Sequence, residues 1–243
     1  MSQNNGESSL QVGIMQPYFL PHFSYFQLIA NTEYFCLHDQ VKYTKQSWIN
    51  RNRIIVSGKI DYITIPVQSS SDLDLIGNKA ISATFDKSAL LRKIELNYKK
   101  SPHFREVFPI ISEILNCNNI NLFEFLENSI TKVCQYLELD TKIVRSSDTG
   151  YNQNLSKSKM VIDICKKLEA DVYINSEGGI ELYEVEEFLE NGIFLRFAKQ
   201  MKLSYVNSLG ETNTSLSMLD TLMWVDKSLI MEKLYEIAYV RAE

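Results

Sequence analysis

The chain has 243 residues and a formal net charge of −5, a length that suits one large domain or one domain with a helical insert. Hydrophobic residues make up 45% and charged residues 23%, which excludes a largely disordered chain. No run of Lys or Arg exceeds two residues, so the extended basic face of a nucleic-acid-binding protein is not predicted.

Cysteine usage and the N-terminal composition bear on compartment and cofactors. The cysteines stand far apart without CxxC spacing, so neither zinc nor redox motifs are indicated and we expect no metal site. The N-terminus is polar and lacks the apolar segment of a signal peptide, and no stretch approaches the length of a membrane span. We therefore expect a reduced, cytoplasmic protein without a tightly bound cofactor.

The first elements are those of a parallel α/β unit. Residues 1–10 are predicted to fray, and residues 12–15 form a short apolar strand. The segment QPYFLP is excluded from a helix by its two prolines. An apolar helical pattern then runs over residues 22–31, and a second buried strand over 34–37. Strand, loop, helix and strand in this order predict a parallel sheet.

The rest of the chain adds a helical block and further alternation. A strand at residues 60–67 is predicted to end near a sheet edge at Pro66. Three helices with apolar faces fill residues 87–138. Later elements are two strands (171–175 and 194–197), a strand near Ile143, and helices over 157–168, 184–190 and 216–240, with Ser156 and Gly192 as N-terminal and C-terminal caps. We predict an α/β fold: one domain over residues 11–243, with a Rossmann-like, mostly parallel sheet flanked by helices and a helical insert or subdomain at about 87–138.

The QPYFLP loop is the first candidate site. Pro17 and Pro21 hold the backbone extended around Tyr18, and the chain then enters a helix at His22, where free backbone N–H groups can meet an anion. HFSY at 22–25 resembles, distantly, the HxGH motif of the nucleotidylyltransferase superfamily, although Ser24 and Tyr25 replace the glycine and the second histidine. The alternatives are a proline-stiffened connection and a histidine that caps the helix.

A dense polar stretch around aromatic residues is the second candidate. Arg51 and Arg53 are suited to phosphate, and Trp48 to stacking on a base or sugar. Asp39 at a strand end is placed to accept a proton or to orient a neighbour, and His38 is an alternative base. A salt-bridged structural loop is the competing interpretation. The full stretch comprises His38, Asp39, Lys45, Trp48, Asn50, Arg51, Asn52 and Arg53.

Two later segments and one cysteine complete the candidates. In YINSEGGIELY, Gly178 and Gly179 permit close backbone approach to a ligand and Asn175 offers an amide, but a tight turn explains the glycines equally well. In NTSLSMLDTLM, the hydroxyl residues before a helix indicate capping, with a phosphate-gripping turn as the alternative. Nucleophile-elbow, GxGxxG and P-loop motifs are absent, and Cys36 lies in an apolar strand without a nearby base, which disfavours a covalent cysteine mechanism.

Taken together, the motifs resemble those of the WbqC-like family. QPYFLPHFSYFQLI, DQVKYTKQSWINRNRI, ITIPV, YINSEGGIELY and LSMLDTLM occur in the family's order and cover about residues 12–225. The sequence departs from the family pattern at Ser24, at His38 and in YVNSLGETNTS. The matching positions are Gln16, Pro17, Tyr18, Pro21, Tyr25, Phe26, Gln27, Asp39, Lys45, Trp48, Asn50, Arg51, Asn52, Arg53, Asn175, Gly178, Gly179, Leu182, Tyr183, Ser217 and Asp220.

The resemblance implies amide formation on an amino sugar in surface-polysaccharide (O-antigen) synthesis. The expected acceptor is a nucleotide-linked amino sugar, and the expected donor an acyl or aminoacyl (for example glycyl) thioester on CoA or on the phosphopantetheine arm of a carrier protein. Asp39, His38 or His22 would act as base, and Asn50 would stabilise the oxyanion. The substrate-binding candidates are Gln16, Tyr18, Tyr25, Lys45, Trp48, Arg51, Asn52, Arg53, Asn175, Gly178 and Gly179.

Two other classes of function stay open at this point. An ATP-using amide ligase or nucleotidyltransferase would extend the HxGH likeness and release AMP or pyrophosphate. A non-catalytic module would bind a sugar nucleotide or a carrier without turnover.

Overall fold

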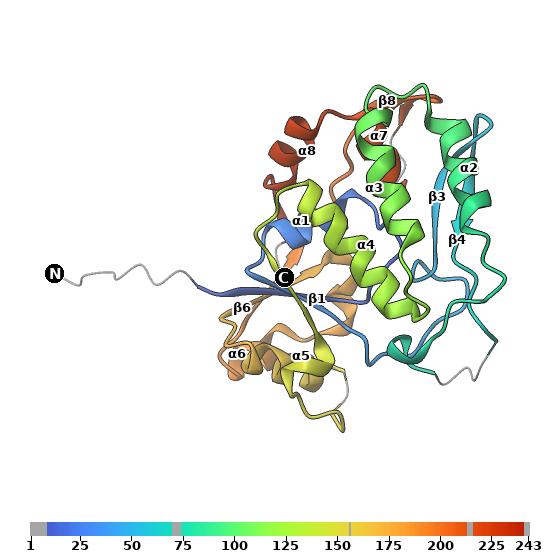
Figure 1. Ribbon diagram of the computed structural model, residues 1–243. Helices are drawn as coiled ribbons and strands as arrows, with labels where there is room; N and C mark the ends of the chain where they lie inside the picture. The colour runs from blue at the N-terminus through green and yellow to red at the C-terminus, as the bar shows by residue number, and fades with distance from the viewer. Residues whose placement is uncertain (1–8, 70–73, 156, 213–215, 241–243) are drawn as a thin grey trace.

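A computed structural model describes residues 9–69, 74–155, 157–212 and 216–240. Its centre is a six-stranded sheet in the order β10-β7-β6-β1-β2-β5, in which every pair is parallel except β10 with β7 (Figure 1). Numbered along the chain, these strands stand in the order 3-2-1-4-5-6, which is that of a Rossmann-type sheet. The predicted fold class is confirmed. The strands are β1 (Gln11–Met15), β2 (Tyr34–Leu37), β5 (Lys142–Arg145), β6 (Val172–Ser176), β7 (Phe194–Ala198) and β10 (Tyr239–Val240).

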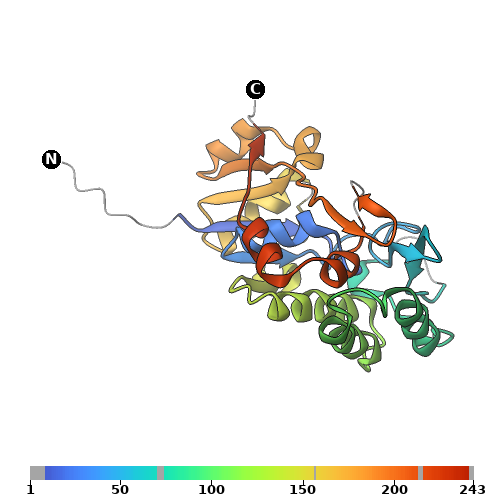
Figure 2. The same cartoon turned by 90° about the horizontal axis from the view of Figure 1, so that it is seen from above.

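Each face of the sheet has its own hydrophobic core, because side chains alternate along the strands. On one face, Val12 and Ile14 belong to a cluster with α5 (Ser158–Lys167) and α6 (Val185–Glu190). On the other face, Phe35 and Leu37 join a larger cluster with α1 (Phe23–Ala30). Figures 1 and 2 show α5 and α6 on one side of the sheet and the green helices on the other.

The predicted helical block is confirmed and covers the second face. It consists of α2 (Lys87–Tyr98), α3 (Phe104–Asn116) and α4 (Leu122–Tyr136). Asp86 and Asn121 cap α2 and α4 by accepting backbone N–H groups from Ala89 and Glu124. In α3 the buried residues are Val107, Ile111, Ile114 and Leu115, whereas Phe104 and Phe108 stack on each other at the margin of this face.

A β-hairpin occupies the segment where the sequence predicted a polar loop followed by one strand. β3 (Arg51–Val56) pairs antiparallel with β4 (Lys59–Thr64) through a turn at Ser57 and Gly58, both with positive φ. The strand β3 was not predicted from the sequence, because it begins with the polar residues Arg51, Asn52 and Arg53. It lies against the QPYFLP loop. A second small hairpin joins β8 (Tyr205–Asn207) and β9 (Gly210–Thr212).

The predicted C-terminal helix over 216–240 is wrong as one element. It is divided into α7 (Met218–Trp224) and α8 (Lys227–Leu234), because Asp226 caps α8 by accepting the N–H of Ser228, and the chain then forms β10. Three short 3₁₀ turns complete the fold: η1 (Ile76–Asn78), η2 (Ser146–Thr149) and η3 (Glu177–Leu182). Residues 1–8, Ser156 and residues 213–215, about which the sequence also made predictions, lie outside the described residues.

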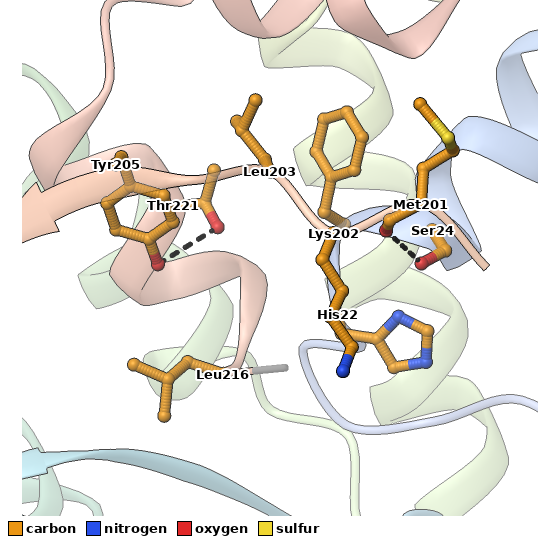
Figure 3. A pocket seen from close by; sticks show the side chains of 9 residues that line it. His22, Ser24, Met201, Lys202, Leu203, Tyr205, Leu216 and Thr221 are labelled. Carbon is orange, nitrogen blue, oxygen red and sulfur yellow. Dashed lines mark hydrogen bonds between the residues drawn. The ribbon is translucent and has the colours of Figure 1, made fainter. Parts of the chain in front are cut away.

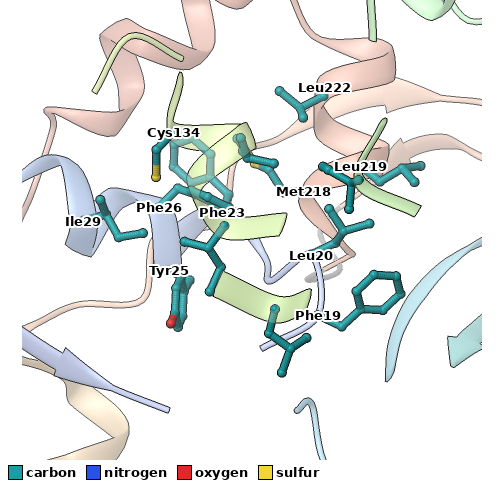
Figure 4. Close-up of a cluster of buried hydrophobic side chains, with 14 of the residues drawn as sticks. Phe19, Leu20, Phe23, Tyr25, Phe26, Ile29, Cys134, Met218, Leu219 and Leu222 are labelled. Atoms are coloured by element: carbon teal, nitrogen blue, oxygen red, sulfur yellow. The ribbon is translucent and has the colours of Figure 1, made fainter. Parts of the chain in front are cut away.

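The QPYFLP loop is fastened to the core from both sides. Phe19 and Leu20 point into the cluster drawn in Figure 4 and are fully buried. Their carbonyl oxygens accept hydrogen bonds from Asn52 Nδ2 at 3.0 and 2.8 Å, and Ser217 Oγ donates to the Leu20 carbonyl at 2.8 Å. Leu20 has a φ of 42°, so these bonds hold a backbone conformation that non-glycine residues rarely adopt.

A substitution at Gly13 can test how tightly the central strand β1 is packed. A Cβ at this position would lie 2.8 Å from Cδ2 of the buried Phe35 ring, whereas one at Gly178 would meet nothing closer than 4.0 Å. We predict that Gly13→Ala lowers the free energy of unfolding by about 1–3 kcal/mol through overpacking. Urea denaturation measures the change, with Gly178→Ala as the matched control. Equal stability of the two variants would contradict the packing shown.

Candidate functional site

A cleft of about 360 Å³ opens at the carboxyl ends of β1, β2 and β6. β1 and β6 are neighbours at which the order of the parallel strands reverses, the place where ligands bind in open α/β sheets. The sequence placed candidate residues at the ends of these same strands. The cleft is lined by Ile14, Met15, Gln16, Tyr18, His38, Val41, Met160, Val161, Tyr173, Asn175, Ser176, Gly178, Gly179, Leu182 and Tyr183.

A chain of hydrogen bonds runs behind the cleft from Asp39 through Ser146 to His38. Ser146 Oγ lies 2.7 Å from Asp39 Oδ1 and 2.8 Å from His38 Nδ1. The same carboxylate accepts the N–H of Ser147 at 3.0 Å and Nε2 of Gln40 at 2.7 Å. Burial raises the pKa of Asp39, but the hydrogen bonds from Gln40, Ser146 and Ser147 outweigh it and leave the pKa below its ordinary value. Asp39 is therefore ionised.

The ionised carboxylate sets the proton positions along this chain. A carboxylate only accepts, so the single hydroxyl proton of Ser146 points to Asp39. Ser146 Oγ then accepts from His38, which places the imidazole proton on Nδ1. Burial lowers the pKa of His38 to about 4, although the charge of Asp39 opposes this shift. Near neutral pH the ring is thus uncharged, and Nε2 carries a lone pair.

His38 Nε2 is buried and has no hydrogen-bond partner in the part of the chain that the structure describes. The residue is only 6% exposed and lies on the cleft wall, with its ring edge-to-face against Tyr151 at 6.1 Å. A buried acceptor without a partner favours a ligand that brings a donor. Of the two roles that the sequence left open for Asp39, these contacts favour orientation over direct proton transfer.

Asn175 is the second polar group in the cleft. Its Oδ1 accepts the N–H of Ser176 at 2.8 Å, which leaves the two Nδ2 protons as donors. A Cβ on Gly179 would lie 2.2 Å from this Nδ2, so a glycine is required for the amide to occupy its position. Gly178 has open space around it. Gly179, but not Gly178, is therefore more than a turn signal.

The QPYFLP loop supplies one wall of the cleft. Gln16 and Tyr18 line it directly, and burial raises the pKa of Tyr18. Tyr25 does not line it; its hydroxyl donates to the Gln16 carbonyl at 3.0 Å and its ring lies 5.6 Å from that of Tyr18. Tyr25 thus supports the wall from behind.

His22 lies beside the cleft and not in it. It borders a cavity of about 20 Å³ with Lys202, Tyr205 and Thr221 (Figure 3), and another of about 120 Å³. The larger cavity shares Met15, Ser176 and Gly178 with the main cleft, so the two adjoin. Burial, and secondly the charge of Arg53, lower the pKa of His22 to about 4. His22 does not cap α1 with its side chain.

The remaining polar residues of the stretch 45–53 are not on the cleft wall. Asn52 fastens the QPYFLP loop, and Asn50 Nδ2 donates to the Ile65 carbonyl at 2.8 Å. Lys45 is exposed, and the side chains of Arg51 and Arg53 lie over the rings of Tyr62 and Trp48. Of the candidate residues from His38 to Arg53, only His38 therefore lines the cleft. Asn50 and Asn52 are buried in contacts with backbone carbonyls, and Arg51 and Arg53 lie against aromatic rings.

Two buried groups serve structure in this arrangement. Asp220, fully buried, accepts hydrogen bonds from Tyr98, Tyr205 and Asn207 at 2.6, 2.7 and 3.0 Å. Ser217 caps α7, as the hydroxyl-rich segment predicted.

Burial raises the pKa of Cys36, Cys134 and Cys165, so these thiols are poor nucleophiles.

Sequence reasoning missed Ser146, Met160 and Val161. Ser146 follows β5 directly, and the register that pairs Leu37 with Arg145 places it beside His38. A polar residue immediately after a predicted strand was the available signal.

No three His, Cys, Asp or Glu side chains gather as a metal site among the described residues, and no described helix is long and apolar enough to span a bilayer.

The profile of the WbqC-like protein family matches residues 16–231, which include Gln16, His38, Ser146 and Asn175. The chain belongs to this family. Another similar protein is the uncharacterized protein Rv1507c of Mycobacterium tuberculosis, which is 31% identical over 167 residues, covering 68% of this chain and 71% of that protein. No solved structure matches the chain. The family match includes the supporting loop and all of the named cleft residues except Ile14 and Met15, and neither relationship specifies an activity.

The lowered pKa of His38 makes stability depend on pH. The unfolded chain binds a proton to this ring below about pH 6.5, while the folded state does so only near pH 4. We predict that stability is fully present above pH 6.5 and that about 3 kcal/mol of it is lost as the pH falls to 4. His38→Gln removes this contribution.

The test is urea denaturation of this WbqC-like protein and of His38→Gln at pH 7.0, 5.5 and 4.5. The difference in unfolding free energy between the two should shrink as the pH falls, while His22 acts equally in both. A difference that is constant over this range would show that His38 is not held neutral by the fold.

Proposed function

We propose that this WbqC-like protein is an N-acyltransferase that forms an amide on an amino sugar, with His38 as the general base. The observation that carries the proposal is the hydrogen-bonded series Asp39, Ser146 and His38, which leaves an unprotonated Nε2 on a residue of the cleft wall. A neutral base of this kind suits the transfer of a proton from an attacking amine. The family match is compatible with the proposal and is silent on the reaction.

The chemistry that fits the residues is direct attack. The amine nitrogen bonds to the thioester carbonyl carbon, and its N–H proton moves to His38 Nε2. The C–S bond then breaks, and the thiolate takes the proton back, giving an amide and a free thiol. The attacking nitrogen becomes more acidic as it gains positive charge, which allows its proton to pass to His38 Nε2. The high pKa values of the buried cysteines support a path without an acyl-enzyme.

Asn175 replaces Asn50 as the proposed oxyanion donor. Its Nδ2 faces a cleft that also holds the base, whereas Asn50 binds a backbone carbonyl elsewhere. A donor of this kind acts on the charge that develops on the carbonyl oxygen. Among the described residues no Lys or Arg lines the cleft, so we place the reacting amine and acyl group there and the phosphates of the substrates outside it.

The decisive experiment is a transfer assay with acetyl-CoA and glycyl-CoA as donors and UDP-glucosamine and dTDP-linked 3-amino and 4-amino sugars as acceptors. Thiol release and the mass of the amide product report the reaction. We predict that His38→Gln lowers kcat by about 100- to 10,000-fold. His103→Gln is the matched control, because His103 begins α3 and does not line the cleft. Release of AMP or pyrophosphate, or an unchanged rate in His38→Gln, would exclude the mechanism.

Gly179 and Asn175 are predicted to act as a unit. Gly179→Ala forces the Asn175 amide to move, and Asn175→Ala removes it, so each should lower kcat by about 100-fold with little change in KM. The double variant should be no slower than either single variant, since both remove one interaction. Measured kcat values for all three check this. Multiplicative losses would mean that Gly179 acts independently of Asn175.

A further inference from the structure

Two arginines and two aromatic residues form a layered surface on the β3–β4 hairpin, which we name the cation–aromatic platform (Trp48, Arg51, Arg53 and Tyr62). The Arg51 guanidinium lies 4.5 Å from the centre of the Tyr62 ring, and that of Arg53 lies 5.2 Å from the Trp48 ring. The two rings stack on each other with centroids 6.3 Å apart. The hairpin stands at the far end of the molecule from α5 and α6 in Figure 1.

The platform lies in the most basic segment of an acidic chain. Between Asp39 and Asp61 the sequence contains no acidic residue, and its cations are Lys42, Lys45, Arg51, Arg53 and Lys59. Asp61 is bound by Lys93 at 2.8 Å. The chain as a whole carries a formal charge of −5, so the hairpin is a positive area on a negative molecule. Such a distribution steers an acidic partner to this face.

The composition of the platform fits a protein interface. Trp48 and Tyr62 are 38% and 40% exposed, and Ile60 beside them on β4 is 42% exposed. Arg51 and Arg53 are partly buried against the two rings. Trp, Tyr and Arg are the residues that dominate the binding energy of protein interfaces.

The platform is joined to the candidate site through the backbone. The Trp48 carbonyl accepts the N–H of Phe19 at 3.1 Å, so the platform is joined directly to the QPYFLP loop, which forms one wall of the cleft. In the other direction, residues 41–48 run from the cleft wall at Val41 to the platform. Two short segments thus connect the platform to the cleft, whose described lining includes no Lys or Arg.

We propose that the cation–aromatic platform docks an acidic carrier protein that presents the acyl thioester to the cleft. This inference rests on the proposed acyl transfer and names the partner that delivers the donor. The platform supplies the electrostatic contact, and the flexible arm of the carrier spans the distance to His38. Binding to the platform and reaction in the cleft are separate events, and each has its own measurement.

The probe is a bacterial acyl carrier protein bearing an acetylated phosphopantetheine arm, with acetyl-CoA as the small-molecule comparison. Binding is measured by isothermal titration calorimetry at 25 and 250 mM NaCl. We expect the wild-type protein to bind the carrier more tightly at low salt, and Arg51→Glu to weaken this binding at least about tenfold. Lys100→Glu, an equal charge change at an exposed lysine two residues after α2, is the control and should stay within about twofold.

Trp48→Ala provides a second variant that does not alter charge, and thermal melting confirms that each variant is folded. Loss of carrier binding with unchanged KM for acetyl-CoA supports the proposal. It is overturned if wild type binds no carrier at 25 mM NaCl, if Arg51→Glu binds like wild type, or if the KM for acetyl-CoA rises equally, which would indicate a phosphate site. Arg51-dependent binding without any amide product would leave the docking in place and refute the acyl transfer.

Discussion

The hydrogen bond from Ser146 to Asp39 determines the chemical state of the candidate site. Because the carboxylate takes the only hydroxyl proton, His38 must hold its own proton on the nitrogen that faces Ser146. The opposite nitrogen, Nε2, is left unprotonated. If Ser146 were turned away, His38 could adopt either tautomer and the cleft would lose its defined base. Two neighbouring strands, β2 and β5, fix the relative positions of the three residues.

Other contacts in the structure offset the free-energy cost of burying these polar groups. Ser147 and Gln40 donate further hydrogen bonds to the Asp39 carboxylate, so that hydrogen-bond donors stabilise its negative charge. Across the cleft, Asn175 keeps its position because Gly179 has no side chain. Asn52 and Ser217 fasten the QPYFLP loop that forms the remaining wall. Each support is a single hydrogen bond or a missing methyl group.

Sequence patterns predicted the mostly parallel sheet, the helical block and the strand-end location of His38, Asp39 and Asn175. These patterns failed for residues that are neighbours in sequence but lie apart in the structure, and for residues that are distant in sequence but in contact. The stretch from His38 to Arg53 is continuous in sequence, but β3 divides it between the cleft and the platform. Ser146 was missed because its partners lie more than a hundred positions away, and only the pairing of β2 with β5 reveals the contact.

The long connection between β2 and β5 has a consequence for how the site is assembled. It contains the β3–β4 hairpin and three helices, and it separates His38 from Ser146 by 108 positions. Contacts of such high sequence separation form slowly, because a long loop must close before they are made. During synthesis the ribosome releases His38 and Asp39 long before Ser146 and Asn175. The contact between His38 and Ser146 can therefore form only after the β3–β4 hairpin and the three helices have been synthesised.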